Sequence, residues 1–301
     1  MRAAPPTARR LVLAALVAAC ALVLSSAHAV GPVPVPLRAD AAALPPVVIA
    51  HRGASASAPE NTLDAVDAAA RAGVEWVEND VQRTRDGVLV VVHDRTLART
   101  TDVEQVYPGR APWRVGDLTA AEIARLDAGS WFGPRFAGVR VPTLAQYLGR
   151  VERNGQKLLL EIKLPDAHPG IARDTLRVLA AAGWLDRARA AHRLVVQSFD
   201  ADTLRAVHAL RPDVRTAFLG APPVGELPAY AGFTDGVNPG RRTLTAAYVR
   251  AVQTVRGRRG EPLRVFAWTV DTHGEARRVA GYGVDGIITN RPDVVRDALE
   301  G

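Results

Sequence analysis

Residues 47–94 read VVIAHRGASASAPENTLDAVDAAARAGVEWVENDVQRTRDGVLVVVHD, and this stretch decides how the rest of the chain is interpreted. It contains three apolar runs, and each ends in polar residues: His51-Arg52, Glu78 with Asp80, and His93-Asp94. In β/α barrels, polar side chains at the carboxyl ends of the strands form the reaction site. The stretch therefore favours an α/β enzyme whose chemistry lies at its strand ends.

The first part of this stretch predicts one strand–helix–strand unit. Residues 47–50 are all apolar, which is typical of a parallel strand buried on both faces. Asn61 or Thr62 is expected to cap the following helix, and Gly73 to end it. The next strand is expected over residues 74–80.

The pattern then changes to a predicted antiparallel hairpin over residues 80–94. Residues 83–87 form a turn signal between two β-rich runs. Symmetry about Asp86 is expected to put His93 opposite Val81, and so close to Asp80.

Residues 82–141 are interpreted as an insertion because they lack a strand–helix rhythm. Within them, Thr119 and Glu122 have the spacing of a capping box, which predicts a helix over residues 119–126. The sequence Trp131-Phe132-Gly133-Pro134 indicates a turn.

After the insertion the alternation resumes with a helix that starts at Pro142-Thr143 and runs to about residue 152. Six more strands are expected at residues 158–162, 194–197, 214–218, 235–238, 265–269 and 286–289. Helices are expected at residues 171–182, 201–210, 243–255 and 273–281, whereas the Pro-rich residues 219–234 are expected to be irregular.

Eight strands alternating with helices over residues 47–301 predict a TIM (β/α)8 barrel with a small insertion after its second strand. The alternative is a doubly wound open sheet, which would gather its polar strand ends at one switch point. Here nearly every strand carries polar residues at its end, which favours the barrel.

The residues before this domain predict export. Residues 1–29 have a basic start, an apolar run at 11–24 and the small-residue cleavage site Ala27-His28-Ala29, as in a secretory signal peptide. Arg9-Arg10 is a partial match to a twin-arginine signal. Lipidation at Cys20 is the less favoured alternative, because the apolar run continues beyond it. Residues 30–46 are rich in Pro and Ala and are expected to form a tether.

Composition and charge are those of a soluble globular protein, with 48% hydrophobic and 23% charged residues. The formal charge is +7, and three of these charges lie in the expected signal peptide, which leaves +4. The remaining excess is spread along the chain, so no nucleic-acid partner is expected, and no stable membrane insertion after signal cleavage.

Three carboxylates are candidate metal ligands. Glu78 and Asp80 are two residues apart on one strand, so their side chains share a face. Two such carboxylates can be ordinary solvated charges. Glu161 argues against that interpretation, because it follows three leucines in a buried strand, where a charge needs a partner. Adjacent strands would bring the three together, and ligation by oxygen atoms alone favours Mg²⁺ or Ca²⁺.

Two histidines and two cations lie beside these carboxylates. His51 and His93 are the candidate proton carriers, because imidazole exchanges protons near neutral pH. Arg52 can bind phosphate oxygens in a bidentate manner, and Glu60 can orient it or ligate the metal. Lys163 is one of only two lysines in the chain. It can pair with Glu161 or neutralise a bound phosphate.

Ten short motifs occur in an order that resembles one enzyme family. They are His-Arg-Gly (51–53), Pro-Glu-Asn-Thr (59–62), Glu-x-Asp-Val (78–81), Thr-x-Asp-Gly (84–87), His-Asp (93–94), Pro-Thr-Leu (142–144), Glu-Ile-Lys (161–163), Ser-Phe-Asp (198–200), Trp-Thr-Val (268–270) and Asp-Gly-Ile-Ile-Thr (285–289). In these motifs residues 47–295 resemble the glycerophosphodiester phosphodiesterase family.

The resemblance implies a TIM barrel with an insertion after strand two. It also implies metal-dependent hydrolysis of glycerophosphodiesters to sn-glycerol 3-phosphate and an alcohol. By resemblance, the metal ligands are Glu78, Asp80 and Glu161. The general acid–base pair is His51 and His93, phosphate is held by Arg52 and Lys163, and Trp268 lines the glycerol site.

Three positions depart from the pattern of the family. Asn79 replaces a residue that is usually apolar, and Asp271 and Asn290 stand where Asn and Asp are common. None belongs to the implied catalytic set, so these departures concern substrate preference.

Two other functions remain open at this point. One is a phospholipase D-like enzyme of the same superfamily, acting on lysolipid or sphingolipid, which would need exposed apolar loops such as Trp131-Phe132. The other is a secreted ligand-binding protein with a degenerate site, against which the five central polar residues argue.

Overall fold

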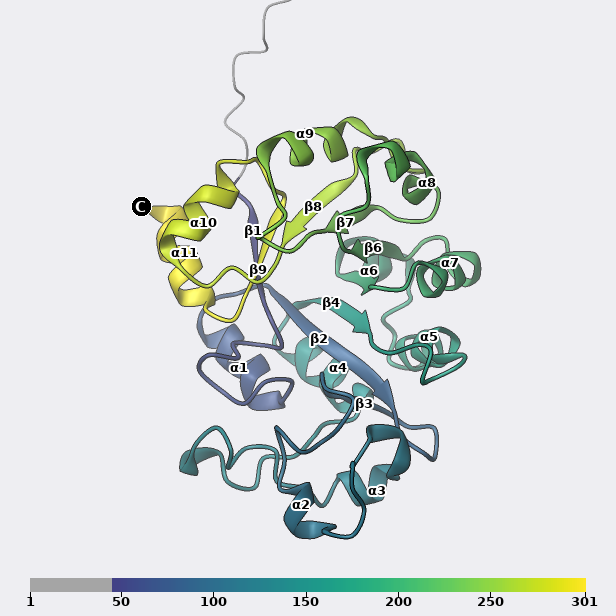
Figure 1. The fold of residues 1–301 in the computed structure, drawn as a ribbon, viewed down its shortest axis with the longest axis vertical. Coiled ribbons are helices and arrows are strands. Elements are labelled where there is room, and N and C mark those ends of the chain that lie inside the picture. Colours follow the sequence, from purple (N-terminus) through teal and green to yellow (C-terminus); the bar gives the residue numbers. More distant parts are fainter. Residues whose placement is uncertain (1–44) are drawn as a thin grey trace, which may run out of the picture. The chain divides into compact units, whose positions relative to one another are not determined.

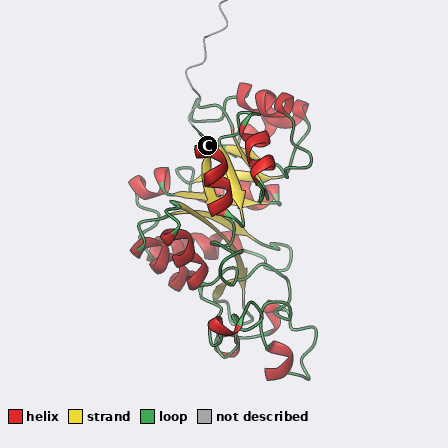
Figure 2. Cartoon of the chain, turned by 90° about the vertical axis from the view of Figure 1, so that its left-hand side faces the viewer, coloured by secondary structure: helices red, strands yellow, loops and turns green. Residues whose placement is uncertain are grey.

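The computed structural model describes residues 45–301, so the predicted signal peptide and most of the predicted tether lie outside the described residues. Eight parallel strands close into a barrel with helices on its outside (Figure 1, Figure 2). The barrel strands are β1 (Val47–Ala50), β2 (Trp76–Arg83), β4 (Lys157–Ile162), β5 (Leu194–Ser198), β6 (Arg215–Leu219), β7 (Gly236–Asn238), β8 (Arg264–Ala267) and β9 (Gly286–Thr289).

Closure of the sheet confirms the TIM barrel and shows that the open-sheet alternative is wrong. Strand β1 pairs in parallel with both β2 and β9, which joins the first strand of the barrel to the last. Each of the eight predicted strands has a counterpart in the barrel. The largest shift is in β2, which starts at Trp76 and continues to Arg83, beyond the predicted end at residue 80.

The helices follow the strands in sequence and surround the barrel. They are α1 (Leu63–Arg71), α4 (Leu144–Arg153), α5 (Ile171–Ala181), α6 (Arg187–His192), α7 (Ala201–Leu210), α8 (Leu227–Ala231), α9 (Ala246–Thr254), α10 (His273–Ala280) and α11 (Pro292–Glu300). Thr62 caps α1 by accepting from the N–H of Ala65, and Thr143 caps α4 in a capping box with Gln146. Thr62, and not Asn61, is therefore the cap of the first helix.

The expectation that residues 219–234 are irregular was wrong. They contain a 3₁₀ turn, η3 (Val224–Glu226), followed directly by α8. Pro228 lies in the first turn of α8, where the missing N–H of proline would have no helical partner anyway. The prolines here therefore start a helix and do not prevent one.

The chain between β2 and β4 forms a hairpin followed by short helical segments with a core of their own. The second strand of the hairpin is β3 (Leu89–Val91), which pairs antiparallel with β2. The helical segments are α2 (Val103–Val106), η1 (Val115–Asp117), α3 (Ala120–Ile123) and η2 (Pro134–Phe136). The capping box of Thr119 and Glu122 is present at α3. Apolar side chains of this segment, among them Leu97, Leu118 and Leu126, are fully buried against one another.

The predicted register of the hairpin was wrong by two residues. Val81 pairs with Val91, and not with His93. The turn is closed by Thr84, whose N–H donates to the carbonyl of Val88. Residues 84 and 88 lie symmetrically about Asp86, and the same symmetry joins residues 81 and 91, so the expected pairing with His93 did not follow from a turn centred on Asp86. His93 consequently lies two residues beyond β3, just past the point where the N–H of Val92 donates to the carbonyl of Asp80.

Two kinds of apolar core hold the barrel. Six side chains fill its interior: Ile49, Leu159, Val195, Ala217, Phe266 and Ile288. Larger clusters lie around the helices outside it and include Val77, Leu158 and Leu160, whose side chains alternate with those of the inward-facing residues. Within residues 45–301, no helix combines the length and the apolar character that crossing a bilayer requires.

Candidate active site

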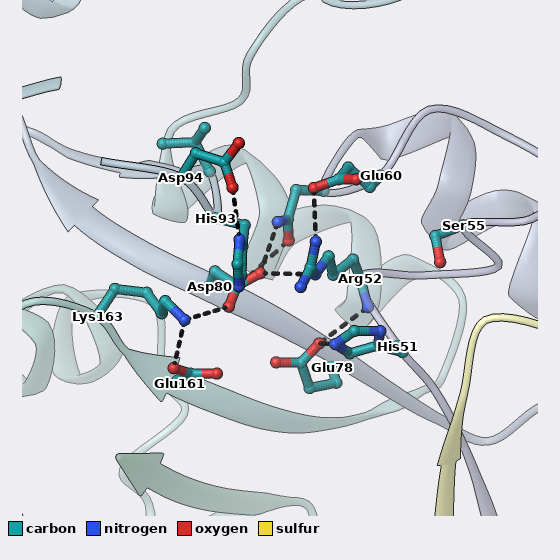
Figure 3. Close-up of polar contacts among 12 residues, drawn as sticks. His51, Arg52, Ser55, Glu60, Glu78, Asp80, His93, Asp94, Glu161 and Lys163 are labelled. Carbon is teal, nitrogen blue, oxygen red and sulfur yellow. Dashed lines mark hydrogen bonds and ion pairs between the residues drawn. The ribbon is translucent and has the colours of Figure 1, made fainter. Parts of the chain in front are cut away.

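Polar side chains gather at the C-terminal ends of the barrel strands, where the sequence predicted them. A cavity of about 80 Å³ opens there. It is lined by His51, Arg52, Glu78, His93, Glu161, Lys163, Gln197, Phe199, Leu219, Trp268, Thr269 and Ile288. Figure 3 shows the polar groups on its β1, β2 and β4 side.

Three carboxylates converge beside this cavity. Glu78 and Asp80 face the same side of β2, and Asp80 is the direct neighbour of Glu161 on β4 in the register of the sheet. One oxygen from each of the three lies within 4.8 Å of the others. Glu78 and Asp80 are fully buried, and Glu161 is 6% exposed. The structure therefore brings together the three residues that the sequence singled out as metal ligands.

The protonation of these carboxylates reflects their crowding. Burial and the neighbouring Asp80 and Glu161 carboxylates raise the pKa of Glu78 well above its ordinary value. Burial and Asp80 raise the pKa of Glu161 to about 8. Burial alone would raise the pKa of Asp80 too, but Arg52 and Lys163 lower it to about 2.

The donor set fits a hard divalent cation. Buried like charges are costly unless a positive charge lies among them, and Asp80 Oδ1 is buried without a hydrogen-bond partner. Carboxylate oxygens are the ligands that Mg²⁺ and Ca²⁺ prefer. Glu78, Asp80 and Glu161 can therefore hold a metal ion.

Arg52 is fixed by contacts on three sides. Its backbone N–H donates to Glu78 Oε2 at 2.9 Å, its Nη1 donates to Glu60 Oε1 at 2.8 Å, and its Nε lies 3.3 Å from Asp80 Oδ2. The next residue, Gly53, has φ +78°, and a Cβ there would lie 2.6 Å from Ala65. Glycine is therefore required for the turn that delivers Arg52. Of the two roles open for Glu60, the structure has it orienting Arg52.

Lys163 bridges two of the candidate ligands. Its Nζ lies 2.8 Å from Glu161 Oε1 and 3.7 Å from Asp80 Oδ1. Burial lowers the pKa of the lysine, but Asp80 and Glu161 outweigh it, so the net shift is upward and the ammonium stays charged. The pairing with Glu161 is thus present, and the same ammonium borders the cavity.

His51 is anchored through its Nδ1 atom, which lies 2.7 Å from Asn290 Oδ1. Asn290 is oriented by Asp271, to which its Nδ2 donates at 2.8 Å. The amide oxygen therefore faces the imidazole, so Nδ1 carries the proton and Nε2 is free. Nε2 points toward the carboxylates, 4.0 Å from Glu78 Oε2 (Figure 3). Burial and Arg52 lower the pKa of His51 to about 4.

His93 is anchored in a similar way, but by a carboxylate. Its Nδ1 lies 2.7 Å from Asp94 Oδ1. Arg99 holds Asp94 in turn, with Nε donating to Oδ2 at 2.5 Å, and also donates twice to Glu60 at 2.8 Å. Both imidazoles thus expose Nε2 to the same cavity, one held by an amide and the other by a carboxylate.

An apolar wall closes the opposite side of the cavity. Phe199 and Trp268 meet edge to face with ring centroids 5.6 Å apart, and Leu219 and Ile288 lie beside them. Phe199 is 52% exposed, and Lys163 Nζ lies 5.7 Å from its ring centroid. The wall offers an apolar surface next to the charged groups.

Sequence reasoning missed several residues that hold the site. Asn61 donates from Nδ2 to Asp80 Oδ2 at 2.8 Å, although it was considered only as a helix cap. Asn290 was noted only as a departure from a family pattern. Asp94 is the second residue of the His-Asp motif, which was the available signal for it. Nothing in the local pattern pointed to Arg99 or Gln197.

A second cavity lies at the other end of the barrel. It measures about 120 Å³ and is lined by the starts of several strands, including Trp76, Leu194 and Arg215. Among residues 45–301, the one group of three possible metal ligands is the carboxylate cluster at the C-terminal end. The chemistry is therefore concentrated at that end, as in other β/α barrels.

Comparisons with known proteins agree with this site and fold. Residues 51–294 match the glycerophosphoryl diester phosphodiesterase family. A glycerophosphodiester phosphodiesterase of Bacillus subtilis is 31% identical over 274 residues, which cover 85% of this chain and 87% of the relative. One of Caldanaerobacter subterraneus is 32% identical over 255 residues, covering 83% and 96%.

A solved structure has the same architecture. An Oleispira antarctica phosphodiesterase in complex with the product sn-glycerol-3-phosphate has a TM-score of 0.72 and 26% identity, covering 85% of this chain and 98% of its own. The family match begins at His51, directly after β1, and covers the other barrel strands and the polar strand ends described above. The chain belongs to the glycerophosphoryl diester phosphodiesterase family, whose members are phosphoric diester hydrolases.

Proposed function

We propose that this protein hydrolyses glycerophosphodiesters to sn-glycerol 3-phosphate and an alcohol, and that the reaction needs one divalent ion, Mg²⁺ or Ca²⁺. The observation that carries the proposal is the convergence of three buried carboxylates and two anchored imidazoles on one cavity. The complex of the Oleispira antarctica relative with sn-glycerol-3-phosphate supports the identity of the product.

Glu78, Asp80 and Glu161 would hold the ion. When bound there, a divalent cation polarises the phosphodiester and offsets the negative charge that develops on its oxygens. Arg52 and Lys163 add to this stabilisation from the protein side. The guanidinium of Arg52 can bind two phosphate oxygens, and the ammonium of Lys163 supplies a point charge.

His51 and His93 move the protons. Each has its Nδ1 anchored, which leaves Nε2 free to accept or donate a proton in the cavity. One imidazole takes a proton from the attacking hydroxyl group, and the other gives a proton to the oxygen of the leaving alcohol. The attacking group is either water or the neighbouring glycerol hydroxyl, and the second route passes through a cyclic phosphate. ³¹P NMR of the reaction distinguishes the two, because only the second route releases or accumulates a cyclic diester.

Trp268 and Phe199 would contact the carbon skeleton of the glycerol. Their edge-to-face arrangement forms an apolar wall opposite the charged groups. A glycerol unit bound there would have its phosphate directed toward Arg52 and Lys163.

A second candidate function is a phospholipase D-like activity on lysolipid or sphingolipid. The observation in its favour is Trp131, which is 41% exposed and lies in a chain of edge-to-face aromatic contacts with Phe132 and Phe136. An exposed aromatic group on a loop can enter a lipid surface.

One panel of substrates separates the two functions. Glycerophosphocholine, lysophosphatidylcholine and sphingomyelin are each incubated with protein and Mg²⁺ or Ca²⁺, then with a chelator in excess. The main proposal expects turnover of glycerophosphocholine that stops on chelation and returns with the metal. Turnover of the lipids alone would favour the second candidate, and turnover of glycerophosphocholine that persists in chelator would refute the metal requirement.

We also propose that the protein is exported, with cleavage after Ala29 and residues 30–46 as a tether before the barrel. The support is the sequence of residues 1–46. N-terminal sequencing of the protein from the medium or periplasm of an expression host is expected to start at Val30. Retention in the cytoplasm with residues 1–29 intact would contradict export, and an acylated Cys20 would show the lipoprotein alternative.

A further inference from the structure

Two amide side chains inside the barrel connect the candidate metal site to its far wall. Gln197 lies on β5 and Asn238 ends β7, and their exposed fractions are only 2% and 1%. Asn238 Nδ2 donates to Gln197 Oε1 at 2.8 Å. Gln197 Nε2 in turn donates to Glu78 Oε1 at 3.4 Å.

The chemistry of the groups gives this chain of hydrogen bonds one direction. A Glu78 that ligates a metal ion is ionised and can only accept, so the amide of Gln197 must turn its Nε2 toward it. Gln197 Oε1 then faces away and needs a donor, which Asn238 supplies. If the amide of Gln197 were reversed, its oxygen would face the carboxylate oxygen, and two acceptors would be in contact in a buried site.

One of the two carboxylate oxygens of Glu78 receives its hydrogen bond from this pair of amides. Its Oε2 accepts from the backbone N–H of Arg52 at 2.9 Å, whereas Gln197 is the donor found for Oε1 among residues 45–301. The other end of the chain is also fixed, because Trp268 Nε1 donates to the backbone carbonyl of Asn238 at 2.6 Å. The carboxylate is thus held from both sides.

We propose that Gln197 and Asn238 are positioning residues that set the orientation of the Glu78 carboxylate for a divalent ion. Gln197 acts on the carboxylate directly, and Asn238 acts through Gln197. The inference rests on the metal site put forward under the proposed function. Hydrogen-bond partners of metal ligands typically change metal affinity 10–100-fold when they are removed.

The test measures metal binding and not activity. Isothermal titration calorimetry with MgCl₂ and with CaCl₂ is performed on the metal-free full-length protein and on Gln197→Met, Asn238→Leu and the double variant. Each single variant is expected to bind the metal about 10–100-fold more weakly. The double variant is expected to bind no more weakly than Gln197→Met, because both changes remove the same contact to Glu78.

Gln156→Met serves as the matched control. Gln156 is equally buried, at 2% exposed, but its Nε2 donates to the carbonyl of Val74 at the other end of the barrel. Its replacement is expected to lower the thermal unfolding temperature and to leave metal affinity within about twofold. A similar loss of metal affinity in this control would attribute the effect to a loosened barrel and overturn the proposal.

A near-isosteric variant keeps the test valid if Asn238→Leu does not fold. In Asn238→Asp the carboxylate can only accept, so the amide of Gln197 turns its nitrogen toward residue 238 and its oxygen toward Glu78. Metal binding is then expected to weaken although a negative charge has been added. Tighter or unchanged binding would overturn the role of Asn238.

The outcomes separate this inference from the proposed function. Wild-type binding of Mg²⁺ or Ca²⁺ together with wild-type affinity in Gln197→Met would refute the positioning role alone. If the losses of metal affinity in the two single variants added up in the double variant, the action of Asn238 through Gln197 would be refuted. Absence of binding by the wild-type protein would refute the metal site, and this inference with it.

Discussion

Asp80 and Glu161 are direct neighbours in the register of β2 and β4, although they lie far apart in the sequence. Their side chains point to the same inner side of the barrel, where Glu78 joins them. Three acidic groups in a nearly water-free position repel one another, and this repulsion is the physical reason to expect a cation among them.

Removing one of these charges is predicted to stabilise the metal-free protein. Glu78→Gln is expected to raise the free energy of unfolding by roughly 1–4 kcal/mol in the presence of a chelator, because burying an acidic group costs up to several kcal/mol and the amide avoids that cost. The wild-type protein is expected to gain stability when Mg²⁺ or Ca²⁺ is added, because a ligand that binds the folded state alone shifts the equilibrium toward it. The variant is expected to lose that gain.

Thermal unfolding in chelator and in excess metal measures both effects. Asp174→Asn, which removes a carboxylate paired with Arg83 on the surface, is the control and should retain the full response to metal. A lower stability of Glu78→Gln in chelator, with the response to metal intact, would contradict the interpretation of the cluster.

The two histidines are predicted to act on protons and not on the metal. His51→Ala and His93→Ala are each expected to lower kcat by about 10²–10⁴-fold, the usual contribution of a general acid or base. Calorimetric titration with metal is expected to give an affinity close to that of the wild-type protein. A rate near that of the wild type in either variant would refute the assignment of that histidine.

The pair formed by His93 and Asp94 is predicted to be needed for turnover. Burial raises the pKa of Asp94, but Arg99 and His93 outweigh it and lower the pKa to about 2, so the carboxylate is charged at neutral pH. Asp94→Asn keeps the shape but removes the charge that orients the imidazole of His93. We expect kcat to fall by about tenfold or more, up to the 10²–10⁴-fold that a general acid or base contributes, with little change in KM.

The chain offers a matched control for this variant. His273 Nε2 lies 2.7 Å from Asp297 Oδ2, in an exposed pair outside the cavity. Asp297→Asn is expected to leave kcat unchanged. If Asp94→Asn and Asp297→Asn had equal activity, Asp94 would have no special role.

The loop that carries Trp131 is predicted to weaken in acid. Burial raises the pKa of Asp127, but the N–H groups of Ser130, Gly138 and Gly129 outweigh it and hold the pKa well below its ordinary value. Because the folded pKa lies below the unfolded value of about 3.9, the stabilisation is complete above that value and is lost as the pH falls toward the folded pKa.

Asp127→Asn tests this dependence. It is expected to lower the free energy of unfolding by about 1 kcal/mol at pH 7, as for the loss of charged hydrogen bonds near solvent. The difference between wild type and variant should shrink below about pH 4, where the carboxylate of the unfolded chain becomes protonated. Urea unfolding at pH 7, 5 and 3 measures it, and a difference that is constant with pH would contradict the account.

The fold could be predicted because its signals are local. Most barrel strands contain a short apolar run, and Thr119 and Thr143 mark helix starts by capping boxes that the structure contains. Pro228 was misread because proline disrupts a helix interior but fits its first turn. The turn centred on Asp86 was recognised correctly, and it pairs Val81 with Val91, so the expected pairing with His93 was an error of counting and not a limit of the sequence signal.

The site could be predicted only in part, because some of its residues carry no signal in their own segments. Glu78 and Asp80 are recognisable because charges at the end of an apolar strand are unusual. Asn290 and Gln197 look ordinary in their own segments. Their roles arise from contacts with His51 and Glu78, which only the closed barrel brings within reach.

The most direct test of the central claim is anomalous diffraction from crystals of the full-length protein grown with Mn²⁺, an ion that shares the preference of Mg²⁺ and Ca²⁺ for oxygen ligands. We predict one strong peak among the carboxylates of Glu78, Asp80 and Glu161, with metal–oxygen distances of about 2.0–2.6 Å. Carboxylates that point apart with no peak between them, or an ion bound elsewhere in the barrel, would contradict the account.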